Sequence, residues 1–225
     1  MKKMLSLVIV FALVMMTATT AFAKDSNADV FSVNVDEEIY NALNGITDLE
    51  VNDPSFAKAV FEKEDGTQEI LQVYTTTREL DIPATLSANN TGKVYATTAV
   101  ATTALSEDKS DSNLKNKYFV TAYGTIYWRD NVGPDNEFLG ASGGWDRDRD
   151  PDTGFLPALS NAKVDMQGQH GAGTYVHKLF YPTTYQFNID KSQFNYVKYS
   201  FWFDSTITVD GSNTLSLHVS TGLLT

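Results

Sequence analysis

The stretch Thr214-Leu215-Ser216-Leu217-His218-Val219-Ser220 alternates strictly between polar and apolar side chains. Successive side chains of an extended chain point to opposite faces, so the two leucines and the valine share one face and the serines and the histidine share the other. Such alternation is typical of a strand that is buried on one side only. The C-terminal part of the chain is therefore expected to form a sheet that covers a hydrophobic core.

The same composition, rich in β-branched and aromatic residues between Gly, Asn, Asp and Pro clusters, recurs upstream at short intervals. In the segment 196–203, Phe201 and Phe203 are expected on the core face and Trp202 on the opposite face. The connections leave no room for the crossover helices of a parallel sheet. The predicted fold class is mostly β, an antiparallel β-sandwich or barrel. Its further strands are predicted at residues 93–104, 118–128, 162–167, 174–180, 185–189, 196–203 and 206–209.

The N-terminal part of the chain is more acidic than the rest. Residues 24–82 contain fourteen Asp and Glu against four Lys and Arg, a net charge of −10, whereas residues 83–225 have a net charge of −3. Helices are predicted at residues 36–43 and 53–65, and a strand at 70–77. We expect residues 24–82 to be a small acidic α+β appendage or a pro-region, joined by a linker at 83–92 to a β-sandwich at 93–225. The alternative is that these acidic side chains only form a solvated face.

The first residues have the composition of an export signal. Lys2 and Lys3 precede an apolar run over residues 4–16, which ends in small and polar residues up to Ala21-Phe22-Ala23. This order predicts a signal peptide over residues 1–23 and a secreted chain that begins at Lys24, with an uncleaved N-terminal anchor as the alternative. Because the chain has no cysteine, no lipid can be attached at the signal and no disulfide can stabilise the exported fold.

The net charge restricts the partners. The whole chain carries −11, and loss of Lys2 and Lys3 with the signal leaves −13. Such a field repels nucleic acid and anionic membrane surfaces, so we expect no nucleic-acid partner. No second long apolar run follows the signal, which predicts no membrane span after cleavage. Divalent cations, basic surfaces and neutral glycans remain as partners.

An acidic run follows the glycine-rich stretch 140–144. Alternate carboxylates at this spacing resemble those that point oxygens at one calcium ion. An EF-hand would need a glycine and a glutamate at positions where this run has neither, and Arg147 and Arg149 offset its charge. A calcium site and an exposed turn with local Asp–Arg pairs both stay open. The candidate metal ligands are Asp146, Asp148, Asp150 and Asp152.

Residues 140–144 read Gly-Ala-Ser-Gly-Gly, a literal G-x-S-x-G. In hydrolases this motif exposes a nucleophilic serine at a sharp turn between a strand and a helix. Ser142 could then be served by Asp165 or Asp190 and by His218, which follow it in the required order. The chain lacks the alternating strands and helices of that fold, so a glycine-rich turn is the other interpretation.

The three histidines, His170, His177 and His218, could in principle bind zinc, but their spacing matches no short ligand motif. Each is equally well explained as a polar residue on the solvent side of a strand. The simpler interpretation is that these histidines do not form a zinc site.

Aromatic side chains offer another kind of site. In the segment 118–128 the even-numbered residues are the better core candidates, which leaves a ladder of Tyr and Thr, including Tyr123 and Tyr127, on the other face. Sugar rings or a partner protein can stack on such a surface if it is open. The alternative is that both faces are covered. Trp145, placed at a turn by this interpretation, is also expected to be exposed.

The absence of a coherent catalytic set favours a non-enzymatic protein. The leading prediction is a secreted binding or structural protein that contacts an extracellular glycan, a cell-wall polymer or a protein through Trp145, Tyr123, Tyr127 and the loops around residues 140–154. Two alternatives are a secreted serine hydrolase that uses Ser142, and a toxin-like protein from which residues 24–82 are removed.

Overall fold

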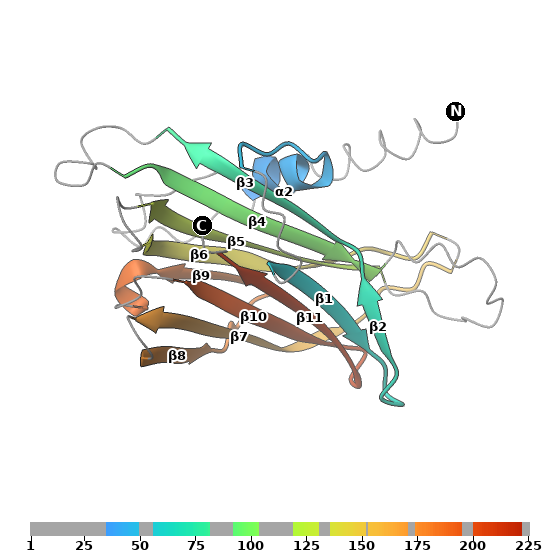
Figure 1. The fold of residues 1–225 in the computed structure, drawn as a ribbon. Helices are drawn as coiled ribbons and strands as arrows, with labels where there is room; N and C mark the ends of the chain where they lie inside the picture. Colours follow the sequence, from blue (N-terminus) through green and yellow to red (C-terminus); the bar gives the residue numbers. More distant parts are fainter. Residues whose placement is uncertain are drawn as a thin grey trace, which may run out of the picture.

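The fold is a sandwich of two antiparallel sheets (Figure 1). The structure is a computed structural model that describes residues 35–49, 56–81, 92–103, 119–130, 136–151, 153–170, 174–194 and 200–221. The predicted fold class, a mostly β antiparallel sandwich, is confirmed. The predicted signal peptide at residues 1–23 and all of the predicted linker except Gly92 lie outside the described residues.

Each sheet combines consecutive, paired strands with strands that are distant in the sequence. In the described part of the chain, sheet A has the spatial order β2 (Gln68–Leu71), β1 (Ala57–Glu62), β11 (Asn213–Ser220), β10 (Phe201–Val209), β7 (Leu159–His170) and β8 (Thr174–Phe180). Sheet B has the order β3 (Val73–Leu80), β4 (Val94–Thr102), β5 (Val120–Asp130), β6 (Asn136–Arg147) and β9 (Gln186–Asp190). Helix α2 (Val35–Leu43) packs on sheet B, and the short 3-10 helix η3 (Lys191–Gln193) follows β9.

The core lies between the sheets, where aromatic rings from both sides meet. Phe187 of sheet B contacts Phe203 of sheet A with ring centroids 5.5 Å apart, and Phe138 of sheet B contacts Phe201 of sheet A at the same distance. The predicted core faces of the last two strands are confirmed, because Phe201, Phe203 and the alternating leucines of β11 are fully buried. Burial of so many large apolar side chains supplies the main stabilising free energy of the fold.

The acidic N-terminal stretch belongs to the sandwich. β1 pairs with β11 over six residue pairs, and β3 pairs with β4 over eight. The described part of residues 24–82 thus contributes strands to both sheets and does not stand beside them as an appendage. Removal of this stretch would leave β11 and β4 as unpaired sheet edges, which favour aggregation.

The predicted helix at residues 53–65 is wrong, because residues 57–62 form strand β1. Phe56, Val60 and Phe61 suit one face of a helix, but Ala59 and Phe61 also alternate with Lys58 and Val60 as a strand requires. Pairing with β11 decides between the two patterns, and Gly66, at φ +82°, allows the turn into β2. The helix predicted at residues 36–43 is confirmed as α2.

Three strand predictions need correction. The segment 70–77 is split at Gln72 between β2 of sheet A and β3 of sheet B. The end of 196–203 and the segment 206–209 form one continuous strand, β10. Residues 140–144, interpreted as a glycine-rich turn because they contain three glycines, lie within β6, which pairs with β5 on one side and β9 on the other.

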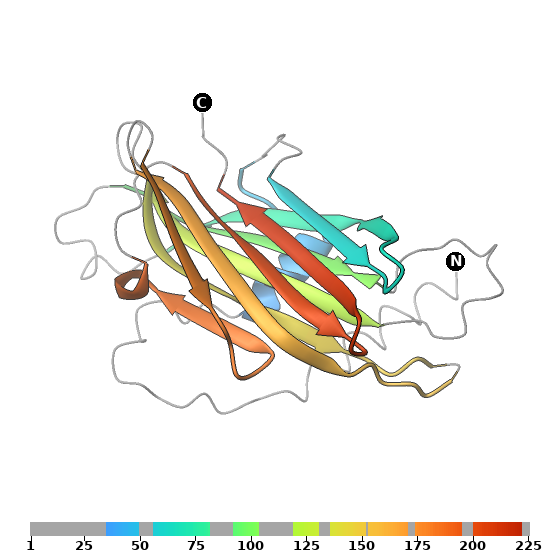
Figure 2. The same ribbon diagram turned by 90° about the horizontal axis from the view of Figure 1, so that it is seen from below.

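The outer faces of the two sheets differ in what covers them. Helix α2 lies over β3, β4 and β5, where Ile39 and Ala42 pack against Val100 and Tyr123. Figure 2 shows β8, β7, β10, β11 and β1 from their outer side with no described helix over them, while α2 lies behind the other sheet. A candidate binding surface on a sheet is therefore to be sought on sheet A.

Candidate functional site

The outer face of sheet A is open to solvent across four neighbouring strands. Along β10 and β11, fully buried residues alternate with partly exposed ones, so each outward side chain keeps an accessible side. We call this surface the open face. Its residues are Ser216, His218, Trp202, Asp204, Thr206, Lys163, Asp165, Gln167, Gln169, Tyr175, His177 and Leu179.

Two aromatic rings mark one end of the open face. Tyr175 on β8 and Trp202 on β10 lie with ring centroids 6.4 Å apart and planes inclined by 74°. Strand pairing brings them together, because Trp202 pairs with Gln167 and Gln169 pairs with Tyr175 on either side of β7. Tyr175 is 66% exposed, so most of its ring is available to a ligand.

Two histidine–aspartate pairs lie beside the aromatic rings. Nδ1 of His218 lies 2.8 Å from Oδ1 of Asp204, and Nε2 of His177 lies 2.7 Å from Oδ1 of Asp165. Asp204 and Asp165 are direct partners in the β10–β7 register, so the two pairs meet at neighbouring carboxylates. His177 lies in register with Gln167, the partner of Trp202, and Asp204 lies two residues, or about 7 Å, from Trp202 along β10.

The open face combines apolar ring surface with planar polar groups. Aromatic rings stack well on the apolar faces of flat ligands. Carboxylates accept hydrogen bonds, and amides both donate and accept them. A neutral imidazole donates at one nitrogen and accepts at the other. The open face therefore offers stacking and hydrogen bonding within one flat, solvent-accessible area. The side chains that provide them are Trp202, Tyr175, Gln167, Asp204 and His218.

The predicted ligand residues Tyr123 and Tyr127 point outward from sheet B, as expected, but they are not exposed. Tyr123 is 5% exposed and Tyr127 4%, because α2 and neighbouring side chains cover this face. The hydroxyl of Tyr127 lies 3.2 Å from that of Ser142, and Nε2 of Gln186 donates to the hydroxyl of Tyr123 at 3.4 Å. Burial raises the pKa of both phenols, so both stay neutral.

The expectation that Trp145 is exposed is wrong. Its side chain is 1% exposed and points into the core from β6, with its ring centroid 5.8 Å from that of Phe187. The error follows from the assignment of residues 140–144 to a turn. Within β6, Ala141, Gly143 and Trp145 share the inner face, so the tryptophan is a core residue.

The glycines of residues 140–144 serve close packing in the sheet. A Cβ on Gly143 would lie 2.5 Å from the carbonyl oxygen of Tyr123 and 2.7 Å from the ring of Phe187. A Cβ on Gly144 would lie 2.5 Å from the carbonyl oxygen of Tyr185. The G-x-S-x-G motif therefore lies within a strand and has no nucleophile-elbow geometry.

The structure does not bring Ser142 and His218 together. Ser142 lies on the outer side of sheet B, where its hydroxyl contacts Tyr127. His218 lies on the outer side of sheet A and contacts Asp204. The two side chains are separated by both sheets and the core between them, so they cannot act as nucleophile and base.

The structure describes three of the four carboxylates predicted as calcium ligands. Asp150 is buried in a turn, where its Oδ1 accepts from the backbone N–H of Thr153 at 3.3 Å and its backbone N–H donates to Phe155 at 2.8 Å. Asp146 and Asp148 are exposed, and Asp152 lies outside the described residues. Within the described residues, no three acidic or histidine side chains converge as a metal site.

The predicted histidine residues do not form a common site either. His177 and His218 each contact a separate aspartate, and the side chain of His170 lies outside what the structure describes. The sequence did not identify Tyr175 as a site residue, and it placed Trp202 only opposite the core face. An aromatic side chain on the polar face of an alternating strand is the signal that could have identified Trp202.

Comparison of the chain with protein-family models, with curated proteins and with solved structures found no match. In the part of the chain that the structure describes, no helix is long and apolar enough to cross a membrane. The candidate site therefore rests on the geometry of the open face.

Proposed function

We propose that this chain is a secreted, non-enzymatic binding protein that holds a neutral extracellular glycan, such as a cell-wall polysaccharide, on the open face. The observation that carries the proposal is the aromatic pair Tyr175 and Trp202 next to two histidine–aspartate pairs, His218 with Asp204 and His177 with Asp165. A flat arrangement of this kind suits an extended polymer better than a small molecule, which binds in a concave pocket.

The chemistry of a sugar matches both parts of the surface. The C–H face of a pyranose ring can stack on the exposed ring of Tyr175 and on the accessible part of Trp202. Its hydroxyls can donate to the carboxylate of Asp204, which is 43% exposed at its side chain, and exchange hydrogen bonds with the amide of Gln167. Stacking gives affinity, and the hydrogen bonds select the orientation of the ring.

Charge favours a neutral glycan over an acidic one. The chain has a net charge of −11, and two carboxylates lie side by side in the open face. Lys163 beside them and Lys58, which pairs with His218, only partly offset this charge. An acidic polysaccharide would be repelled over the Debye length of about 8 Å at physiological ionic strength.

The proposal is tested by affinity electrophoresis and calorimetry with neutral and acidic polysaccharides. The native protein should bind at least one neutral polysaccharide, and Trp202→Ala and Tyr175→Ala should each weaken binding by about tenfold or more, as expected for aromatic anchors. Tyr40→Ala is the matched control, because Tyr40 is 59% exposed on α2, away from the open face. It should leave the affinity unchanged.

Two results would contradict the proposal. One is the absence of binding to every neutral polysaccharide by a protein whose unfolding transition shows that it is folded. The other is binding that Tyr40→Ala weakens as much as Trp202→Ala, because this would show general adhesion of tyrosines rather than recognition by the open face.

A further inference from the structure

Helix α2 covers sheet B through an interface that contains unsatisfied polar groups. Ile39 and Ala42 pack on Val100 and Tyr123, as an amphipathic helix should. Glu38 and Asn41 are each 4% exposed, yet Oε2 of Glu38 and Nδ2 of Asn41 have no hydrogen-bond partner among the described residues. Burial of unsatisfied polar groups is unfavourable, so the docked position of α2 carries a free-energy penalty.

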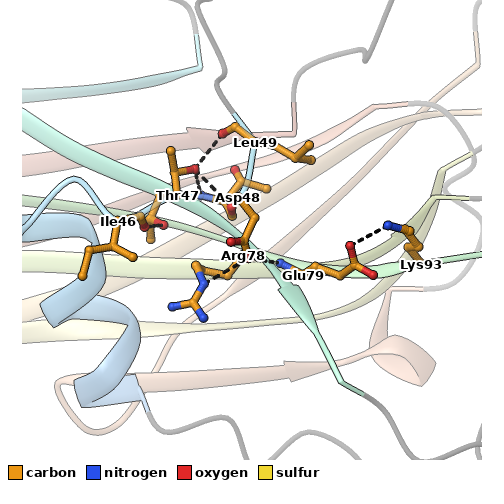
Figure 3. A network of polar contacts seen from close by, with 9 residues as sticks. Ile46, Thr47, Asp48, Leu49, Arg78, Glu79 and Lys93 are labelled. Carbon is orange, nitrogen blue, oxygen red and sulfur yellow. Dashed lines mark hydrogen bonds and ion pairs between the residues drawn. The ribbon is translucent and has the colours of Figure 1, made fainter.

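The segment after α2, residues 46–49, is hydrogen-bonded to β3 (Figure 3). Oδ2 of Asp48 accepts from Nε of Arg78 at 3.1 Å and from the backbone N–H of Glu79 at 3.0 Å. The hydroxyl of Thr47 accepts from the backbone N–H of Thr77 at 3.1 Å, and the backbone N–H of Asp48 donates to the carbonyl of Thr77 at 2.9 Å. This segment would hold the helix to the sheet even if the helix itself moved away.

The N-terminal end of α2 is acidic and faces further acidic groups. Asp36, Glu37 and Glu38 occupy its first turn. At the end of β6, the pKa of Asp146 is raised by burial, by the charge of Asp148 and, least of the three, by the charge of Asp36. The segment after the helix is thus hydrogen-bonded to the sheet, whereas the first turn of the helix carries negative charge near other carboxylates.

We propose that α2 is a hinged cover, anchored at residues 46–49, that leaves the outer face of sheet B when the carboxyl group of Glu38 is ionised. In the docked helix a neutral carboxyl group can be buried at much lower cost than a carboxylate. Undocking lets water solvate the carboxylate and exposes Tyr123, which packs against the helix in the docked state. This inference does not depend on glycan binding by the open face.

The surroundings of Glu38 determine the sign of the pH dependence. Burial raises its pKa above the ordinary value of 4.5; Arg78 of β3 lowers it, while Glu37 of the same helix and Asp48 of the anchor raise it. Tyr127 of β5 also lies near Glu38, whose charge contributes to the raised pKa of Tyr127, but the phenol itself is neutral. The pKa of Glu38 is raised in the docked state, so Glu38 favours docking most below pH 4.5. Its contribution to docking weakens as the pH rises through the raised pKa.

The anchor responds to pH in the opposite direction. The hydrogen bond from the backbone N–H of Glu79 and the contact with Arg78 lower the pKa of Asp48 below its ordinary value of 3.8. The stabilisation that Asp48 gives to the anchor is therefore complete above pH 3.8 and is lost as the pH falls through the lowered pKa of Asp48. Since this range lies below the titration of Glu38, a measurement from pH 5 upward reports on Glu38 with the anchor intact.

Hydrogen exchange of the intact protein tests the inference. After correction for intrinsic exchange rates, the protection of residues 35–43 should fall as the pH rises from 5 to 8, by up to tenfold for each pH unit of the Glu38 titration that lies in this range. Glu38→Gln, which cannot ionise, should abolish this fall. Glu37→Gln is the matched control, because Glu37 is exposed on the same helix turn, and it should keep the fall.

Amides of β11 serve as the internal reference and should keep the same protection in all variants and at both pH values. Unchanged protection of α2 between pH 5 and 8, or a fall that persists in Glu38→Gln, would overturn the proposal. Titration of the Glu38 carboxyl carbon by NMR in the native protein is a second measurement that needs no variant. A pKa at or below the ordinary glutamate value would also overturn the proposal.

Discussion

The outer faces of the two sheets carry similar residue types but have opposite exposure. On β5, Tyr123, Thr125 and Tyr127 point away from the core and are nevertheless buried. On β10 and β8, Trp202, Thr206 and Tyr175 also point away from the core and remain accessible. The strands themselves do not cause this difference. A nine-residue helix about 80 residues upstream of β5 covers one face, and no described helix covers the other.

Replacement of the same residue type on both faces should give the largest contrast. Tyr123→Ala empties a buried site next to α2, and such aromatic truncations cost about 3–5 kcal/mol of unfolding free energy. Tyr175→Ala removes a ring that is 66% exposed and should change stability by no more than about 0.5 kcal/mol. Chemical denaturation of both variants, monitored by far-UV circular dichroism, measures the difference.

Equal stabilities of the two variants would mean that α2 does not cover Tyr123 in solution. In that case the covered face would be a second open surface. The original prediction of a Tyr123 and Tyr127 ligand surface would then regain its basis.

The sequence predicts strands well where alternation is local, as in residues 214–220, because one strand's own side chains show which face is buried. It fails for β6, because glycine has no side chain to show a face and Gly140, Gly143 and Gly144 resemble a turn. Glycine is required at these positions because of contacts with neighbouring strands, and the local sequence does not indicate these contacts. β1 was misassigned for a similar reason, since only its pairing with β11 excludes the helix.

The candidate site was harder to predict than the fold. Tyr175 and Trp202 are 27 positions apart, and the β10–β7–β8 register alone makes them neighbours. The predicted ligands Tyr123 and Tyr127 had the right direction but the wrong exposure, since exposure depends on where α2 docks. Side-chain direction is a property of one strand, whereas exposure is a property of the assembled molecule.

Addition of one methyl group to each face tests how tightly the covered face is packed. Gly144→Ala would place its Cβ 2.5 Å from the carbonyl oxygen of Tyr185 and 2.8 Å from the hydroxyl of Tyr123. Such overpacking should destabilise the fold by about 1–3 kcal/mol. Ser216→Thr adds a methyl to the open face between Val60 and Thr206, where we expect a change within about 0.5 kcal/mol. Thermal unfolding of the two variants checks this difference, and a neutral Gly144→Ala would show that the covered face can relax.

The smallest expected effect concerns the anchor that keeps the covered face covered. Asp48→Ala removes the contacts to Arg78 and to the backbone N–H of Glu79, but both side chains are partly exposed, so solvent screens the ion pair. The global unfolding free energy should therefore fall by no more than about 1 kcal/mol. Hydrogen exchange of α2 should nonetheless accelerate, because local opening needs only the contacts of the helix and its anchor to break. Exchange in β10 and β11 should not change. Equal acceleration in those strands would mean that α2 unfolds only with the whole sandwich, and the two faces would then differ in static cover but not in dynamics.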